Sequence, residues 1–182
     1  MKVLGIIPAR YGSARFEGKP LADIYGKPMI QRVYEQAIKA IDIVYVATDH
    51  TQIYDVVKSF GGNVVMTNAD HETGTNRCLE ASNKIQESFS HDVVINIQGD
   101  EPLLDPDNLK ALIQIFVSDH SVDFGTLIKS VDPNKDKLEA GDGVYVTKKE
   151  NDEAILFSRS IIPFVRDCSK ENWIKQHTFF KH

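Results

Sequence analysis

The chain has 182 residues, a formal net charge of −5 with histidines neutral, 42% hydrophobic residues and 9% aromatic residues. This size and apolar content suit one globular domain with a real core, and they exclude a disordered tail and a basic nucleic-acid-binding protein. No apolar run reaches the roughly 18–20 residues of a membrane span, and Cys78 and Cys168 form no CxxC motif, so we expect a cytoplasmic protein without a structural zinc site or a disulfide.

The first part of the chain alternates between strand and helix patterns. Residues 4–7 are apolar and precede a proline, which suits a buried strand, and residues 11–20 carry the glycines and charges of a loop. Apolar residues then recur at helical spacing over 28–41, where a proline can open the helix, and residues 43–47 form the next apolar strand.

The alternation continues through the middle of the chain. The next helix is expected over 53–60, with Thr48 or Asp49 as its cap and two glycines at its end. The further elements are a strand at 63–66, a helix from 73 to 85, a strand at 93–97, a helix from 105 to 116 that begins with a capping aspartate and a proline, and a strand at 124–128.

This order of elements predicts an α/β fold. Strands separated by helices imply right-handed crossovers, and therefore a three-layer, Rossmann-like arrangement with a mostly parallel sheet between helices. The polar stretch 132–142 then leads into a β-hairpin with strands at 144–146 and 154–157, which we expect to be appended to the core. Because no long linker interrupts the chain, we expect a single domain, with an α/β core over 1–130 and the hairpin region over 131–182.

The loop after the first strand has the composition of a phosphate-binding loop. Glycines such as Gly12 let backbone N–H groups turn toward phosphate oxygens, and Arg10, Arg15 and Lys19 supply positive charge. The loop is neither a Walker A motif nor a GxGxxG dinucleotide fingerprint. A solvated glycine loop with incidental charges is the alternative interpretation.

The segment after the strand at 93–97 supplies a candidate metal ligand. Magnesium prefers one or two carboxylates together with phosphate oxygens and waters, so Asp100, which follows a flexible glycine, is suited to this role. Glu101 precedes a proline that restricts its backbone, and we expect it to act only locally. The alternative is an acidic surface turn that leads into a helix.

Residues 71–77 form a third polar cluster. Gly74 and Thr75 at a helix N-terminus offer free N–H and hydroxyl groups to a nucleotide. Arg77 opposes the helix dipole there, so an anionic ligand would stabilise it. The alternative is an ordinary capped helix. For Asp49 and His50, at the end of the strand at 43–47, we expect capping.

Two arginines follow the hairpin. Arg159 emerges from its second strand and Arg166 follows a few residues later; each could clamp a carboxylate or stabilise an oligomer interface. The segment 173–182 is too apolar for a solvated tail. A strand that begins at Thr178 would have its continuation cut off, so we expect that the chain is part of a longer protein.

Taken together, these clusters resemble the 3-deoxy-manno-octulosonate cytidylyltransferase (CMP-KDO synthetase) family. The matching stretches lie in order from Ile7 to Arg159 and are IPARYGSARFEGKPL, DIYGKPMI, VATD, GGNVVMT, HETGTNR, INIQGDEPLL and AILFSR. The resemblance implies a nucleotidyltransferase fold and a homodimer, with region 131–182 on the sugar side and at the dimer contact. It also implies transfer of CMP from CTP to 3-deoxy-D-manno-octulosonate with Mg²⁺, giving CMP-KDO and pyrophosphate for lipopolysaccharide synthesis.

The resemblance also implies roles for particular residues. Arg10, Lys19 and Asp100 would be catalytic, and Asp100 would bind the metal. The CTP-binding residues would be Gly12, Ser13, Arg15, Gly74, Thr75 and Arg77, and the sugar-binding residues would be Gln98, Arg159, Arg166 and His182.

The sequence departs from the family pattern at three points. Glu17 stands where the family usually has proline, which adds a negative charge to the phosphate loop, and Asn76 replaces an acidic residue beside Arg77. Family members also continue past His182 with further sugar contacts and a second magnesium-binding aspartate. We therefore expect little transferase activity from these 182 residues alone.

Three other functions are possible. CMP-sialate synthetases share the IPAR-type opening but not the GKPMI and QGDEP stretches. The expected truncation after His182 and the extra charge of Glu17 favour a module that binds CTP without catalysis. An NAD-dependent oxidoreductase is disfavoured by the missing glycine fingerprint.

Overall fold

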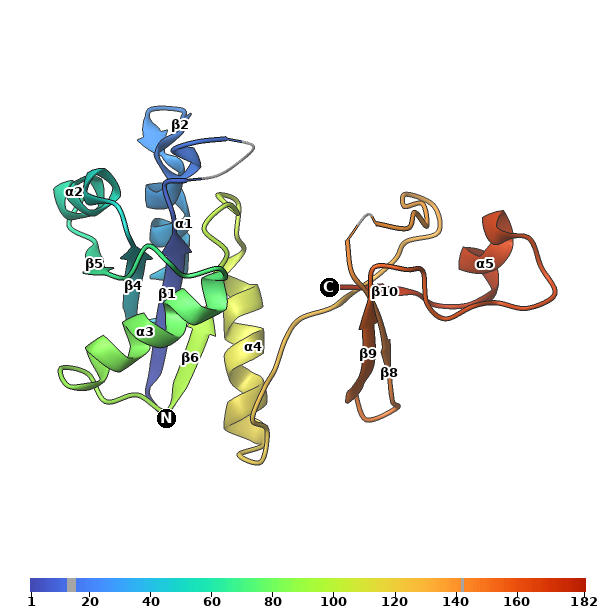
Figure 1. The fold of residues 1–182 in the computed structure, drawn as a ribbon. Coiled ribbons are helices and arrows are strands. Elements are labelled where there is room, and N and C mark those ends of the chain that lie inside the picture. The colour runs from blue at the N-terminus through green and yellow to red at the C-terminus, as the bar shows by residue number, and fades with distance from the viewer. Residues whose placement is uncertain (13–15, 142) are drawn as a thin grey trace. The chain divides into compact units, whose positions relative to one another are not determined.

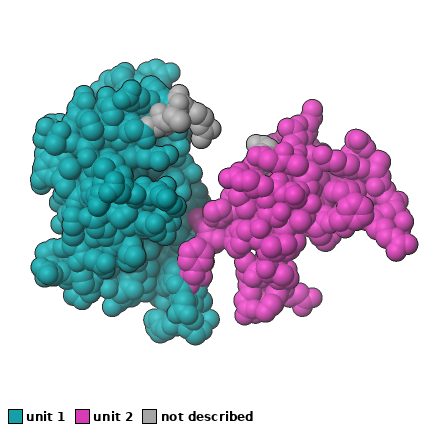
Figure 2. Space-filling view, viewed as in Figure 1, with its two compact units in different colours: residues 1–123 teal, residues 124–182 magenta. Residues whose placement is uncertain are grey.

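The computed structural model describes residues 1–12, 16–141 and 143–182 and divides the chain into two compact units (Figures 1 and 2). Unit 1 comprises residues 1–123 and unit 2 comprises residues 124–182. The sequence analysis places the end of the α/β core at residue 130, a few residues after this boundary. The two units are described separately below.

Unit 1 is built on a four-stranded sheet with the order β5-β4-β1-β6. All three pairings are parallel, and β1 is central because it pairs with both β4 and β6. A short antiparallel ribbon and a 3₁₀ turn, η1 (Lys19–Leu21), follow β1. The strands of unit 1 are β1 (Val3–Ala9), β2 (Asp23–Ile24), β3 (Lys27–Pro28), β4 (Ile43–Thr48), β5 (Asn63–Met66) and β6 (Val93–Asn96).

Helices cover both faces of this sheet, which confirms the predicted three-layer α/β fold. In Figure 1, α3 (Gly74–Gln86) crosses in front of the sheet and α1 (Met29–Ala37) lies behind it. The helices α2 (Thr51–Ser59) and α4 (Pro106–Ser118) share the face of α1, where their apolar residues pack with those of the strands in one cluster. Strand residues on the opposite face, such as Leu4 and Ile6, pack against Cys78, Ala81 and Ile85 of α3.

The helix starts show why these segments fold locally, and they correct one prediction. Asp105 caps α4 as expected, because its side chain accepts from Asp107 N, and a proline follows it. For α2, the prediction that Thr48 or Asp49 is the cap is wrong. The N-cap is His50, without a side-chain hydrogen bond, and Thr48 Oγ1 instead accepts from His50 N at 3.3 Å.

Unit 2 contains a four-stranded antiparallel sheet with the order β7-β10-β8-β9. The predicted hairpin is confirmed as β8 and β9, and Val131, Leu138, Tyr145 and Phe179 form the core beside the sheet. The elements are β7 (Lys129–Ser130), β8 (Tyr145–Lys148), β9 (Ala154–Ser158), α5 (Lys170–Gln176) and β10 (Phe180–Lys181).

The predicted strand at 124–128 is wrong. This segment has apolar residues but no pairing partner among the described strands, and Phe124 remains 81% exposed. The first residues of unit 2 that enter a sheet are Lys129 and Ser130. Within the described parts of the chain, no helix combines the length and the apolar composition that a membrane crossing requires.

Candidate active site

The carboxyl ends of β1 and β6 form a topological switch point. From β1, the chain moves outward through β4 to β5, and α3 then carries it back to β6 on the other side of β1. The loops that leave β1 and β6 therefore diverge, and such a point is where open α/β sheets bind ligands. Three of the polar clusters that the sequence predicts lie in loops that reach this edge.

Two glycines bring these loops into close contact with the end of β1. A Cβ atom on Gly99, just after β6, would lie 3.0 Å from the carbonyl oxygen of Pro8. A Cβ atom on Gly74, at the start of α3, would lie 3.3 Å from Pro8 Cγ. Since neither the backbone carbonyl nor the rigid ring of Pro8 can easily give way, glycine lets these segments approach β1 without a clash. The three predicted clusters thus meet around Pro8.

Lys19 and Asp100 are joined across the switch point. Lys19 Nζ donates to Asp100 Oδ2 at 2.6 Å, which connects the loop after β1 with the loop after β6. The side chains remain 38% and 51% exposed, so the pair itself contributes little to stability. Both groups are accessible to a ligand. The sequence analysis assigned Arg10, Lys19 and Asp100 to one site; the structure brings Lys19 and Asp100 together, and the convergence of Arg10 with them stays a prediction.

The Asp100 carboxylate fits a magnesium ion that takes its other ligands from a bound substrate and from water. No group of three or more His, Cys, Asp or Glu side chains suited to a metal gathers within residues 1–12, 16–141 and 143–182. Magnesium does not need such a cage, because it binds one or two carboxylates and takes its remaining ligands from phosphates and waters. The half-exposed Asp100 carboxylate at a phosphate-type loop meets that requirement.

The remainder of the loop after β1 carries an exposed positive charge and is closed by a backbone hydrogen bond. Arg10 and Gly12 are exposed just beyond β1, and Gly18 N donates to Tyr11 O at 2.9 Å, which closes the loop in front of η1. Glu17 is exposed, so its departure from the family pattern brings no buried negative charge. Ser13 and Arg15 lie outside the described residues, and their phosphate contacts stay predictions.

The start of α3 is ordered by capping. Thr73 Oγ1 accepts from Asn76 N at 3.1 Å, and Thr75 is exposed in the first turn. Gly74 packs on Pro8, as described above. A contact of Gly74 and Thr75 with a nucleotide fits this position and stays a prediction.

Arg77 lies beneath this helix end instead of projecting from it. Its side chain is 3% exposed, its Nη2 donates to Asp49 Oδ2 at 2.7 Å, and its Nη1 donates to Thr67 Oγ1 at 2.6 Å. Asp49 thus supplies the negative charge that an arginine near the helix N-terminus requires. The capping role expected for Asp49 is wrong, and a direct contact of Arg77 with CTP stays a prediction.

Tyr11 and His50 form a contact that the sequence analysis missed. Their rings stack with centroids 3.9 Å apart and an interplanar angle of 15°. Tyr11 belongs to the loop after β1, and His50 precedes α2. The only available signal was that each follows a strand whose carboxyl end reaches the same edge of the sheet.

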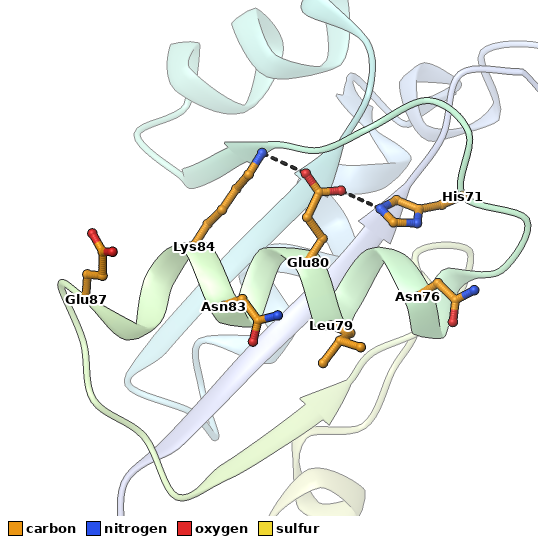
Figure 3. Close-up of a pocket in the computed structure, with 7 residues that line it drawn as sticks. All are labelled: His71, Asn76, Leu79, Glu80, Asn83, Lys84 and Glu87. Carbon is orange, nitrogen blue, oxygen red and sulfur yellow. Dashed lines mark hydrogen bonds and ion pairs between the residues drawn. The ribbon is translucent and has the colours of Figure 1, made fainter.

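A shallow pocket of about 660 Å³ lies along the outward face of α3 (Figure 3). Its polar centre is Glu80, which binds His71 Nε2, accepts from Lys84 Nζ at 2.7 Å and accepts from Asn68 N at 2.9 Å. The hydrogen bonds from Lys84 and then from Asn68 lower the pKa of Glu80 to about 2. Glu80 therefore fastens the segment before the α3 cap to the helix.

Replacing Glu80 with Gln is expected to lower the free energy of unfolding by about 1 kcal/mol at pH 7, after allowance for solvent screening. The pKa of Glu80 is about 2 in the folded protein against 4.5 ordinarily, so its stabilisation is complete above pH 4.5 and declines as the pH falls toward 2. Urea unfolding should thus show a smaller difference at pH 3.5 than at pH 7. Glu87→Gln, in the same pocket, serves as control; an equal loss in both variants would contradict the role of Glu80.

The predicted sugar-side residues of unit 2 each have separate neighbours. Arg159 is exposed and its carbonyl accepts from Gly141 N, whereas Arg166 pairs with Asp167 at 3.2 Å. The His182 ring lies edge-on to Phe157, and its Nε2 is 2.7 Å from Thr126 Oγ1. No hydrogen bond or ion pair joins Arg159, Arg166 and His182 to one another among the described residues of this unit.

Comparisons with known proteins show the family of the chain. Residues 4–181 match the cytidylyltransferase family. The 3-deoxy-manno-octulosonate cytidylyltransferases of Parabacteroides distasonis and Bacteroides thetaiotaomicron are 49% and 51% identical, and each alignment covers 100% of this chain and 72% of the relative. A solved structure of CMP:2-keto-3-deoxy-manno-octonic acid synthetase complexed with CTP has a TM-score of 0.87 at 38% identity, and it covers 100% of this chain and 71% of that one.

Proposed function

Because the chain belongs to the cytidylyltransferase family, we propose that it transfers CMP from CTP to 3-deoxy-D-manno-octulosonate and releases pyrophosphate. The Lys19–Asp100 contact at the switch point carries this proposal. It places a cation suited to phosphate and a carboxylate suited to magnesium 2.6 Å apart on one accessible edge. A fold with the same strand order could bind many nucleotides, so the function rests on this site together with the family.

The reaction needs charge neutralisation and alignment more than it needs a protein nucleophile. A hydroxyl oxygen of the sugar forms a bond to the α-phosphorus of CTP, and the bond from that phosphorus to the pyrophosphate oxygen breaks in line. Lys19 would neutralise charge that develops on the departing pyrophosphate, and Arg10 would hold the triphosphate in the loop after β1. Gly12, Ser13 and Arg15 would complete that loop around the phosphates.

We assign the magnesium ligand to Asp100, whose exposed carboxylate fits the ion as described above. Bound magnesium supplies Lewis-acid stabilisation of negative charge on the phosphate oxygens. On nucleotide binding, Lys19 would donate to phosphate oxygens and the Asp100 carboxylate would hold the magnesium. The pairing seen here therefore keeps both groups aligned for their separate tasks.

Each unit, taken by itself, offers side chains that suit the sugar acid. Gln98 is exposed two residues before Asp100 and offers its amide to sugar hydroxyls. Arg159 and Arg166 have guanidinium groups that can bind a carboxylate with two hydrogen bonds, and His182 offers a further donor. Gly74 and Thr75 would bind the nucleotide at the start of α3.

The proposed function is tested by calorimetry followed by a pyrophosphate assay on the same protein. We expect CTP with Mg²⁺ to bind while NAD does not, and any pyrophosphate release, however slow, to depend on the added octulosonate. Binding of CTP without pyrophosphate release would assign the chain a CTP-binding role without catalysis. Equal binding of NAD, or no binding of CTP, would contradict the proposal.

We also propose that the chain forms a homodimer through unit 2. The edge strand β9 exposes Ile155, Leu156 and Phe157, with exposed fractions of 63%, 52% and 42%. An apolar edge strand of this kind favours pairing with another chain. Among the described strands, β9 pairs with β8 alone, so its other edge is open.

Replacing Ile155 and Leu156 with Ser is expected to shift the protein from dimer to monomer, because the substitutions remove apolar surface from the exposed edge. Light scattering at matched concentrations measures this directly. Replacing the exposed Val117 of α4 with Ser serves as the control, since it removes apolar surface elsewhere. A dimer that persists in the β9 variant would contradict this interface.

A further inference from the structure

The stacked pair of Tyr11 and His50 lies next to the proposed site but has no part in the chemistry described so far. His50 begins α2, where its carbonyl oxygen accepts from Tyr54 N at 3.1 Å. Its neighbour Asp49 is fixed by the buried Arg77. The His50 ring therefore projects from a well-anchored backbone.

This imidazole interacts mainly through its face. The rings of His50 and Tyr11 are nearly parallel and 3.9 Å apart, which is a stacking arrangement. The ring atom Nδ1 of His50 is buried and has no hydrogen-bond partner within the described part of the chain. Within the described residues, the stack on Tyr11 is therefore the ring contact of His50 that the structure shows.

The Tyr11 ring in turn contacts the residue before Lys19. Gly18 has a φ of +67°, and a Cβ atom there would lie 3.3 Å from Tyr11 Cε2. Glycine thus packs flat against the ring, in a backbone conformation that other residues avoid. Gly18 N also donates to Tyr11 O, so both the ring and the backbone of Tyr11 hold Gly18.

Gly18 is the N-cap of η1, and Lys19 follows it directly. The turn η1 also packs against α2, the helix that His50 begins. A continuous series of contacts therefore runs from His50 through Tyr11 and Gly18 to Lys19, and from Lys19 Nζ to Asp100.

We propose that His50 is a positioning residue of the nucleotide site. By stacking on Tyr11, it fixes the backbone of Gly18 and so holds Lys19 opposite Asp100. The part that concerns CTP rests on the proposed function, whereas the part that concerns Gly18 does not.

The first experiment tests the positioning without any nucleotide. We expect the Gly18 amide to exchange its hydrogen about five- to tenfold faster in His50→Ala than in the wild type, which is the effect of losing one aromatic contact. His50→Phe should restore the wild-type rate because it keeps a flat ring. His120→Ala, at an exposed histidine of unit 1, should change nothing. Tyr11→Leu gives the same test from the other ring if His50→Ala does not fold.

The second experiment measures CTP affinity by calorimetry. We expect His50→Ala to weaken binding about fivefold, by the same loss of one stack, with recovery in His50→Phe. In a Lys19→Ala background, His50→Ala should weaken binding no further, because its effect passes through Lys19.

The outcomes separate this proposal from the proposed function. An unchanged Gly18 exchange rate in His50→Ala, or no recovery in His50→Phe, would overturn the positioning role. A full additional loss of affinity in the Lys19→Ala background would overturn the path through Lys19. Wild-type protein that binds no CTP would contradict the proposed function, while the exchange rates would still decide the role of His50.

Discussion

Replacing Lys19 with Ala is expected to weaken binding of CTP with Mg²⁺ by about 10- to 100-fold. This range corresponds to the loss of a hydrogen bond between charged groups. Because Lys19 is 38% exposed and its pair with Asp100 contributes little to folding, the melting temperature should stay close to that of the wild type. Calorimetric titration and thermal unfolding of the same samples measure both quantities.

A matched control for this variant is Lys39→Ala. Lys39 is another exposed lysine of unit 1. It follows α1, outside the loops that leave β1 and β6, and its Nζ donates to Gln36. The control removes the same charge from the protein, so it corrects for a general change in electrostatic attraction. Equal affinities in the two variants would show that Lys19 does not contact the nucleotide.

The largest loss of stability is expected when the buried pair of Arg77 and Asp49 is broken. Arg77→Leu should lower the free energy of unfolding by about 3 kcal/mol, because it leaves the carboxylate of Asp49, which is 13% exposed, without its partner. Asp49 is already poorly satisfied, since its Oδ1 is buried without a hydrogen bond to any described residue. Urea unfolding at pH 7 measures the change.

A second variant shows that the loss comes from the unpaired charge. Replacing Arg77 and Asp49 together with Leu should cost clearly less than the sum of the two single changes, because neither charge is then left alone. Arg10→Leu, at an exposed arginine of the same unit, should change stability by less than about 0.5 kcal/mol. Additive losses in the double variant would contradict a coupled pair.

Apolar periodicity predicted the four-stranded sheet and the helices of unit 1, but it missed the short ribbon of β2 and β3 and placed the end of α1 four residues too late. The strands of its four-stranded sheet are short apolar runs, and its helices have one apolar face, so local pattern and tertiary packing agree there. The strand at Asn63–Met66 was predicted with the bounds it has, and the cap of α4 was predicted at Asp105. Such agreement is expected where a helix or strand packs on a single core.

Unit 2 was less predictable because its elements depend on distant partners. Strand β10 is only two residues long and is stabilised by pairing with both β7 and β8. The segment 124–128 has a strand-like composition, yet pairing in the described sheet begins only at Lys129. The helix α5 is short and has no fully buried residue, so no apolar face marked it in the sequence.

At the candidate site, charge and position were predictable but pairing was not. Lys19 and Asp100 could be placed at one edge because both follow parallel strands next to each other in the sheet. The partner of Arg77 lies 28 residues away at the end of another strand, and nothing in the sequence pairs the two. The stack of Tyr11 on His50 likewise depends on how distant segments pack, so the sequence did not predict it.

The central claim is that Lys19 and Asp100 together hold the triphosphate and its metal at the switch point between β1 and β6. A crystal structure of the protein with CTP and Mg²⁺ tests this most directly. The account predicts phosphate oxygens within hydrogen-bond distance of Lys19 Nζ and the metal bound to a carboxylate oxygen of Asp100. A nucleotide bound with its triphosphate away from both residues, with the Lys19–Asp100 pair intact, would contradict it.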